Sequence, residues 1–300
     1  MKAVLLLAHG TPNTVGEMGE YLGKVTGGRP MPQHVIEELQ HRYAEIGLGE
    51  TPGAEPPPLT LWTLKQAALL GDRIDVPVYV GMRNWHPYIA DTVAQMKADG
   101  VTSARVICLA PQTSRTSIGL YKKALLDAVG SDFAIDFVEG WSAQPQLIAA
   151  FAERLRTAWS TACTPAGAKL PVLFTAHSVP CRTVQGETPD PYGVEAKRTA
   201  ELVAEQAGIE RWVFAFQSQG VAGGPWIGPT VEETLTALKQ EGEPGVVIQP
   251  IGFVCDHVEV LYDIDIAFEK TAAGIGLQLF RAESLNDSPL LTEALIKLAQ

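Results

Sequence analysis

A nine-residue segment occurs twice in the chain, and this repeat limits the fold more than any other feature. VLLLAHGTP at residues 4–12 and VLFTAHSVP at residues 172–180 share Val, Leu, Ala, His and Pro at equivalent positions. Each copy is an apolar run that ends in a polar turn, as expected for a buried strand followed by a loop. Internal repetition of this kind predicts two similar halves.

Apolar runs typical of strands alternate with helical patterns along both halves. Strands are predicted at residues 2–8, 59–63, 76–82 and 104–110, and helices at 35–46, from 64, at 88–99 and at 141–158. Such alternation is typical of βαβ units and a parallel sheet. We therefore predict an α/β fold with two Rossmann-like halves, each a parallel sheet flanked by helices, and an active-site cleft between them. The predicted parts are residues 1–158, a turn-rich linker at 159–169, and residues 170–300 with a final helix that docks back on the body.

Composition excludes several classes of protein. The 23 basic and 34 acidic residues give a net charge of −11, which argues against a nucleic-acid surface. The four cysteines are scattered and form no CxxC pair, so no iron–sulfur cluster and no disulfide framework is expected. A reducing cytoplasm suits them. No stretch approaches the roughly 18 apolar residues that a transmembrane helix needs.

The stretch at residues 245–270 combines an apolar run with acidic side chains. VVIQPIGFV predicts a buried strand, and the pattern that follows it is helical. Glu259 and Asp263 are four residues apart and should share one helix face, where two like charges are unfavourable unless a cation lies between them. A second interpretation is structural, because Asp256 followed by Glu259 resembles a capping box that only starts the helix.

The repeat places His9 and His177 at equivalent strand ends. A single histidine in an apolar segment is usually a hydrogen-bonded core residue, but the ends of parallel strands are where α/β proteins bind ligands. His177 and Glu259 together would supply one nitrogen and one carboxylate. Such a pair could hold a borderline metal weakly or transfer protons. Incomplete ligation suits a protein that passes a metal on, since structural sites usually have four ligands.

Several blocks of the sequence resemble the ferrochelatase family, in the family's order. They are spread along nearly the whole chain and are LLLAHGTP, GGRP (27–30), LWT with Lys65-Gln66, VGMRNWHPY (80–88), FTAHSVP (174–180), FQSQG (216–220), PWIGPTVEE (225–233), PIGFVCDHVEVLYDIDIAFE (250–269) and ESLNDSP (283–289). The combination of His177 with Glu259 inside these blocks is far more specific than either motif alone.

The resemblance implies a lyase of haem biosynthesis that inserts Fe²⁺ into protoporphyrin IX or coproporphyrin III and releases two pyrrole protons. It implies no permanently bound cofactor, because iron is a substrate. His177 would be the essential imidazole and Glu259 its partner, both in contact with the metal. The expected proton or metal track contains Asp263, Asp256 and His257. The expected porphyrin-binding residues are His9, Arg29, Arg42, Arg83, Trp85, Ser218, Trp226 and Phe253.

The sequence departs from the family at four points. Ala267 stands where many members carry a third acid, Thr26-Gly27 replace arginines, His9 stands where other residues occur, and the loop at 47–58 is longer and rich in proline. A lid or rim role is expected for this loop. The choice between the two porphyrins stays open.

Two other functions compete with iron insertion. They are a cobalt chelatase of the vitamin B12 branch, which would lack the DHVEVLYDID block, and a haem or porphyrin carrier without turnover. Transient contact with neighbouring enzymes of haem synthesis is a further expectation.

Overall fold

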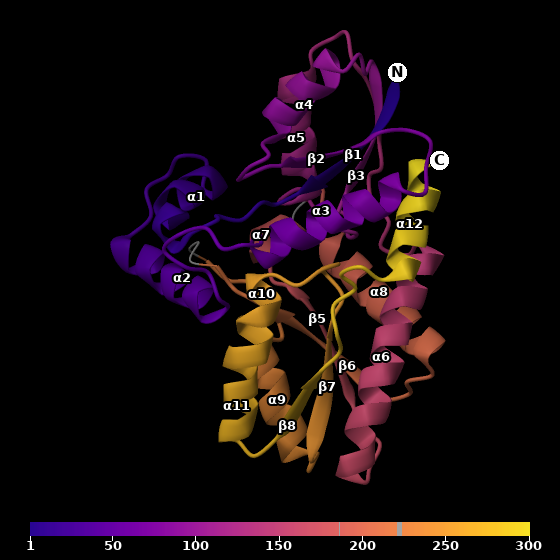
Figure 1. The fold of residues 1–300 in the computed structure, drawn as a ribbon. Coiled ribbons are helices and arrows are strands. Elements are labelled where there is room, and N and C mark those ends of the chain that lie inside the picture. The colour runs from indigo at the N-terminus through magenta and orange to yellow at the C-terminus, as the bar shows by residue number, and fades with distance from the viewer. Residues whose placement is uncertain (186, 221–223) are drawn as a thin grey trace.

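The computed structural model describes residues 1–185, 187–220 and 224–300, and it contains two four-stranded parallel sheets (Figure 1). The strand order of the first sheet is β2-β1-β3-β4, and that of the second is β6-β5-β7-β8. The strands are β1 (Lys2–Ala8), β2 (Val78–Met82), β3 (Ser103–Cys108), β4 (Ala134–Phe137), β5 (Val172–His177), β6 (Trp212–Gln217), β7 (Gly245–Pro250) and β8 (Gln278–Arg281). The two sheets therefore repeat one topology, which confirms the prediction of two Rossmann-like halves.

Helices cover both sheets. Those of the first half are α1 (Met18–Val25), α2 (Gln33–Glu45), α3 (Pro58–Gly71), α4 (Ile89–Ala98), α5 (Ile118–Val129) and α6 (Pro145–Ala166), with a 3₁₀ turn at Val15–Glu17. Those of the second half are α7 (Cys181–Val184), α8 (Tyr192–Ala207), α9 (Val231–Gln240), α10 (Val258–Leu261), the π-helix η2 (Asp263–Phe268), α11 (Glu269–Gly274) and α12 (Pro289–Ala299). Over the described residues, no helix combines the length and apolar character that crossing a membrane requires.

One local prediction is wrong in the first half, and two elements were not predicted. Residues 59–63 form the start of α3 and not a strand, and Thr60, Thr63, Ala67 and Leu70 are buried at helical spacing. A short apolar run is compatible with a buried helix as well as a strand, and Pro58 at the first position favours the helix. The glycine-rich segment before residue 30 contains α1, and β4 was not predicted.

The expected turn-rich linker is also wrong for most of its length, because α6 continues to Ala166. Trp159 donates from Nε1 to the Leu170 carbonyl at 2.8 Å, and Ala162 is buried. These contacts bind the predicted linker to the body. The helix ends at Gly167, whose φ of 63° suits the left-handed cap.

The two halves share one hydrophobic core. Leu6 of β1 and Phe174 of β5 belong to the same buried cluster, together with Phe151 of α6 and Leu295 of α12. In Figure 1 the yellow helix α12 lies along α6, and it also contacts α3 and β3 of the first half. The predicted docking of the final helix is therefore confirmed.

Candidate active site

His177 lies at the carboxyl end of β5, which is an inner strand of the second sheet. Its Nδ1 contacts the Ser178 carbonyl oxygen, and because a carbonyl only accepts, Nδ1 carries a proton in this contact. Nε2 lies 3.5 Å from Oε1 of Glu259. A proton or a cation between these two atoms would be held by both.

Glu259 occupies the first turn of α10, one strand away from His177. Its carbonyl oxygen accepts from Nε2 of Gln217 at 2.7 Å, which ties the start of the helix to the end of β6. Burial acts to raise the pKa of the Glu259 carboxyl, but the neighbouring histidines, led by His177, and Arg42 hold it below its usual range. The side chains of His177 and Glu259 are each 32% exposed, so a ligand can reach both.

Two further histidines surround Glu259. His257 packs its ring against Phe253 with centroids 4.3 Å apart, and burial lowers its pKa. Burial also lowers the pKa of His9 to about 4, and Nε2 of His9 lies 3.1 Å from the Asn84 amide. Both rings are thus neutral near pH 7, which is the form that can accept a proton or bind a metal.

Asp263 lies one turn beyond Glu259, at the start of the π-helix. It accepts a hydrogen bond from Ser218, whose positive φ of 61° places the hydroxyl beside it. Nη1 of Arg42 lies 3.5 Å from its other oxygen, and the Arg42 guanidinium also covers the Tyr262 ring. Burial and the charge of Glu259 nevertheless raise the pKa of Asp263 to about 6. The structure therefore brings Asp263, Ser218 and Glu259 together.

Asp256 points away from this group, and the structure does not connect it to the expected track. Its carboxylate accepts from Oγ of Ser284 at 2.7 Å and Nδ2 of Asn286 at 2.8 Å. The capping interpretation is wrong, because the residue before α10 is His257 and no side chain caps this helix. The partners of Asp256 lie in the segment after β8, which no local pattern could indicate.

The other expected porphyrin-binding residues have different surroundings. Trp226 and Phe253 are half-buried beside the histidines, with the Trp226 ring centroid 6.4 Å from that of His177. Arg83 lies near His9 and lowers its pKa. Arg29 is exposed, and its Nε donates a hydrogen bond to the Thr26 carbonyl oxygen within the same turn.

Two members of the set already have other contacts. Trp85 is 3% exposed and packs against Tyr21 and Met18 in a small core under α1. With so little surface free it supports this wall of the site and does not present a ring face. Arg42, expected to pair with a propionate, instead pairs with Asp263 and Glu38.

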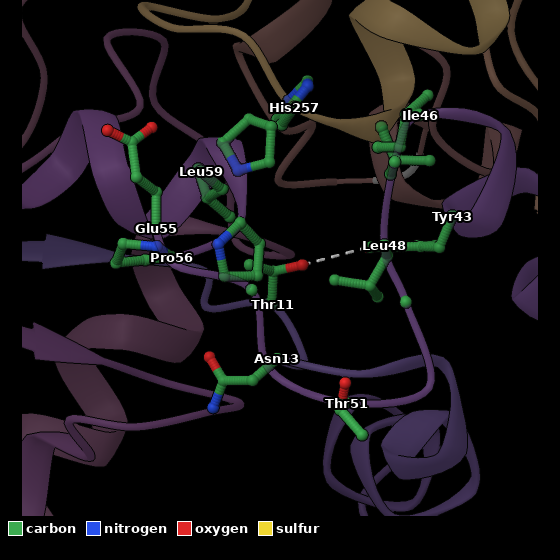
Figure 2. Close-up of a pocket in the computed structure, with 16 residues that line it drawn as sticks. Thr11, Asn13, Tyr43, Ile46, Leu48, Thr51, Glu55, Pro56, Leu59 and His257 are labelled. Carbon is green, nitrogen blue, oxygen red and sulfur yellow. Dashed lines mark hydrogen bonds between the residues drawn. The ribbon is translucent and has the colours of Figure 1, made fainter.

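A cavity of about 230 Å³ opens beside His257 under the proline-rich loop (Figure 2). Thr11 donates to Tyr43 across its floor at 3.5 Å, and Glu55 stands on the loop side. His257 lines this cavity and also lies near Glu259. His177 lies near Glu259 but does not line the cavity. The loop thus forms a rim of this cavity.

Sequence reasoning missed the residues that support the pair. Gln217 holds the Glu259 carbonyl, and Tyr43 and Thr11 line the cavity. Gln217 lies within the FQSQG block, so its position next to Ser218 at a strand end was the available signal. Among the described residues, no three His, Cys, Asp or Glu side chains form a group that could hold a metal ion.

Comparison with known proteins assigns the chain. The model of the ferrochelatase family matches residues 1–300, the whole length. The chain belongs to the ferrochelatase family. A ferrochelatase of Acidobacterium capsulatum is 57% identical over 99% of this chain and 93% of the relative. A coproporphyrin III ferrochelatase of Geobacillus thermodenitrificans is 33% identical over 97% of this chain and 93% of the relative.

Membership of this family confirms the prediction of a metal-inserting enzyme of haem biosynthesis. The fold agrees with solved chelatase structures. The sirohydrochlorin chelatase SirB of Bacillus subtilis subspecies spizizenii, in complex with cobalt, superposes with a TM-score of 0.57 over 99% of this chain and 93% of that chain. Its 11% identity to this ferrochelatase family member shows a common fold alone.

Proposed function

We propose that this chain inserts Fe²⁺ into a porphyrin held between the two sheets, with His177 and Glu259 as the reacting pair. The observation that carries the proposal is the 3.5 Å separation of Nε2 and Oε1 at a strand end. Iron and two pyrrole N–H groups enter the reaction, and the iron porphyrin and two protons leave it. The paired lone pairs can hold the incoming cation or accept the departing protons.

The ligand set fits a metal that must be passed on. One imidazole and one carboxylate leave most coordination positions of iron open to the porphyrin nitrogens. The Nδ1–H contact to the Ser178 carbonyl fixes the ring orientation, as in many metal-binding histidines. Asp263, with its pKa raised to about 6, can exchange a proton near neutral pH and continue the path away from Glu259.

The test replaces each member of the pair. His177→Ala should abolish iron insertion, measured anaerobically from the porphyrin absorbance, while binding of the porphyrin remains. Glu259→Gln should reduce turnover at least about 100-fold, since a general base or charged ligand is lost. Lys123→Ala, an exposed residue of α5, is the control and should retain full activity. Undiminished turnover in His177→Ala would refute the role assigned to His177, whereas porphyrin binding without turnover in the wild type would favour a carrier role.

The native porphyrin and the location are proposals of the same kind. Relatives named ferrochelatase and coproporphyrin III ferrochelatase both match, so the two porphyrins should be compared side by side. The four free cysteines are compatible with the cytoplasm proposed from the sequence. Transient contact with enzymes that supply the porphyrin or accept the haem is proposed on the chemistry alone.

A further inference from the structure

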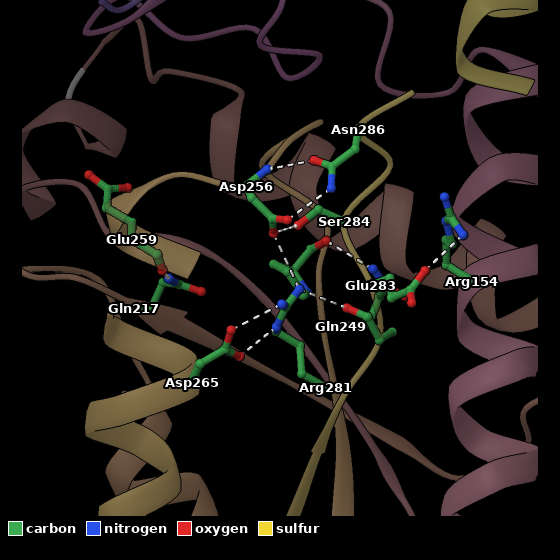
Figure 3. Close-up of polar contacts among 12 residues, drawn as sticks. Arg154, Gln217, Gln249, Asp256, Glu259, Asp265, Arg281, Glu283, Ser284 and Asn286 are labelled. Carbon is green, nitrogen blue, oxygen red and sulfur yellow. Dashed lines mark hydrogen bonds and ion pairs between the residues drawn. The ribbon is translucent and has the colours of Figure 1, made fainter. Parts of the chain in front are cut away.

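The segment from Asp256 to Asp265 carries four carboxylates, and they separate into two pairs. Glu259 and Asp263 face His177 and Ser218 in the site. Asp256 and Asp265 both contact Arg281 on the opposite side (Figure 3). In Figure 3 the Glu259 side chain points away from Arg281.

We propose that Arg281 is a positioning residue for iron insertion, which holds Glu259 in place by clamping both ends of its segment. The inference rests on the proposed function and adds a residue that touches neither His177 nor Glu259.

The contact with Asp265 is a two-pronged ion pair. Nε of Arg281 lies 2.5 Å from Oδ1, and Nη2 lies 3.0 Å from Oδ2. Nη1 reaches back to Oδ1 of Asp256 at 3.4 Å. The Arg281 and Asp256 side chains are only 19% and 18% exposed and that of Asp265 is 34% exposed, so water screens the Asp256 contact less than it screens surface pairs. The planar fork of arginine presents donors to both carboxylates at once.

The Asp256 end is anchored more firmly still. Besides Ser284 and Asn286, which donate to its carboxylate, its backbone N–H donates to Oδ1 of Asn286 at 2.8 Å. Asn286 has a positive φ of 47°, a conformation that asparagine tolerates better than most residues. Nε2 of Gln66 on α3 binds the Asn286 carbonyl at 2.8 Å. This end of the clamp is therefore tied to the first half of the molecule.

The helix that carries Glu259 starts without a side-chain cap. Helix α10 has four residues and continues through the π-helix into α11, with Val260 and Ile264 buried on the inner side. Core packing therefore holds the inner face, and Arg281 contacts the polar side chains at each end of the Glu259 segment. Arg281 comes from the end of β8, where it is in register with Ile248 of β7. The clamp thus fixes the Glu259 segment relative to the sheet.

The test compares Arg281→Met in two backgrounds. In the wild-type protein we expect a fall in kcat of about 10-fold to 100-fold, because a displacement near 1 Å at the reacting group is enough for this. The KM for porphyrin should change by less than about twofold, because Arg281 contacts no site residue. In the Glu259→Asp background, where the carboxylate is already displaced, Arg281→Met should cost little more, since two changes on one path are not additive.

Arg211→Met is the matched control, because Arg211 also bridges two carboxylates, Glu241 and Glu243, far from the site. It should leave kcat unchanged. If Arg281→Met fails to fold, Asp265→Asn removes only one arm of the clamp and should show a smaller loss of kcat with the same background dependence.

Two results would overturn the proposal. One is an unchanged kcat in Arg281→Met, and the other is an equal fold-loss in the wild-type and Glu259→Asp backgrounds, which indicates general destabilisation. A wild-type protein without iron insertion would refute the proposed function itself, which separates the two failures.

Discussion

At the scale of single residues, the buried carboxyl of Asp263 makes the stability of the protein depend on pH. Burial raises the pKa of Asp263 from 3.8 to about 6 despite the hydrogen bond from Ser218 and the nearby Arg42. Between these pH values the folded protein keeps a proton that the unfolded chain releases. The free energy of unfolding therefore falls as pH rises through this range.

This gives a prediction for Asp263→Asn. Above pH 6, burial of the charged Asp263 carboxylate lowers the free energy of unfolding by up to about 3 kcal/mol. The neutral amide of the variant removes this loss. The variant should unfold at a higher temperature than the wild type at pH 8 and at nearly the same temperature at pH 3.5, as followed by circular dichroism. Turnover should fall, since the amide exchanges no proton.

Asp127→Asn is the control for this experiment, because Asp127 is an exposed carboxylate on α5 that pairs with Lys123. Its effect on the unfolding temperature should be small. A lower unfolding temperature of Asp263→Asn at pH 8 would show that the ion pair with Arg42 outweighs the burial of Asp263.

At the scale of elements, the Arg42 side chain connects α2 to the start of the π-helix. The guanidinium of Arg42 pairs with Asp263 at 3.5 Å and covers the Tyr262 ring at 5.3 Å. Both contacts link the first half to the segment that carries Glu259. A half-buried pair of this kind and a cation–π contact are together worth about 1–2 kcal/mol.

Arg42→Met should therefore loosen α2. Its backbone amides are expected to exchange with deuterium about 10-fold faster, because the local opening energy falls by that amount. Arg198→Met removes the exposed ion pair between Arg198 and Glu201 on α8 and should leave the hydrogen exchange of α2 unchanged. Equal exchange in Arg42→Met and the wild type would mean that packing of Tyr43 and Val35 alone holds the helix.

The sequence could predict elements whose signal is local and could not predict partners that are distant. The runs around β1 and β5 are apolar on both faces, so they identify parallel strands and align His9 with His177. The strand ends suggested the pairing of His177 with Glu259, and the family resemblance made it specific. Residues 59–63 have an apolar pattern that fits helix or strand, and only packing decides between them.

Asp256 illustrates the limit more sharply. Its spacing from Glu259 fits a capping box, yet its partners Ser284 and Asn286 lie 28 and 30 residues later. Nothing in the local sequence indicates that the chain returns to this point after β8. Arg281 was missed for the same reason, since its role depends on two contacts made through the fold.

At the scale of the whole molecule, the repeat suggests two independent domains, but the core joins them. Leu295 of α12 is fully buried in the cluster that contains strands of both sheets. The helix follows the second sheet in the chain and packs on α3 and β3 of the first half. Arg105 of β3 also donates to the Leu298 carbonyl at 2.7 Å. The two halves should therefore unfold together.

Leu295→Ala tests this coupling. Loss of a buried leucine costs about 2–5 kcal/mol, and a shared core should spread that cost over both sheets. Denaturant unfolding should stay a single transition at lower concentration, and hydrogen exchange should accelerate in β1 and β5 alike. Lys297→Ala, an exposed change on the same helix, should have little effect. Acceleration confined to β5 and its sheet would instead support the independent halves 1–158 and 170–300. Because the proposed reacting pair comes from the second half while Arg42 and most residues that line the cavity come from the first half, only joint stability keeps the site assembled.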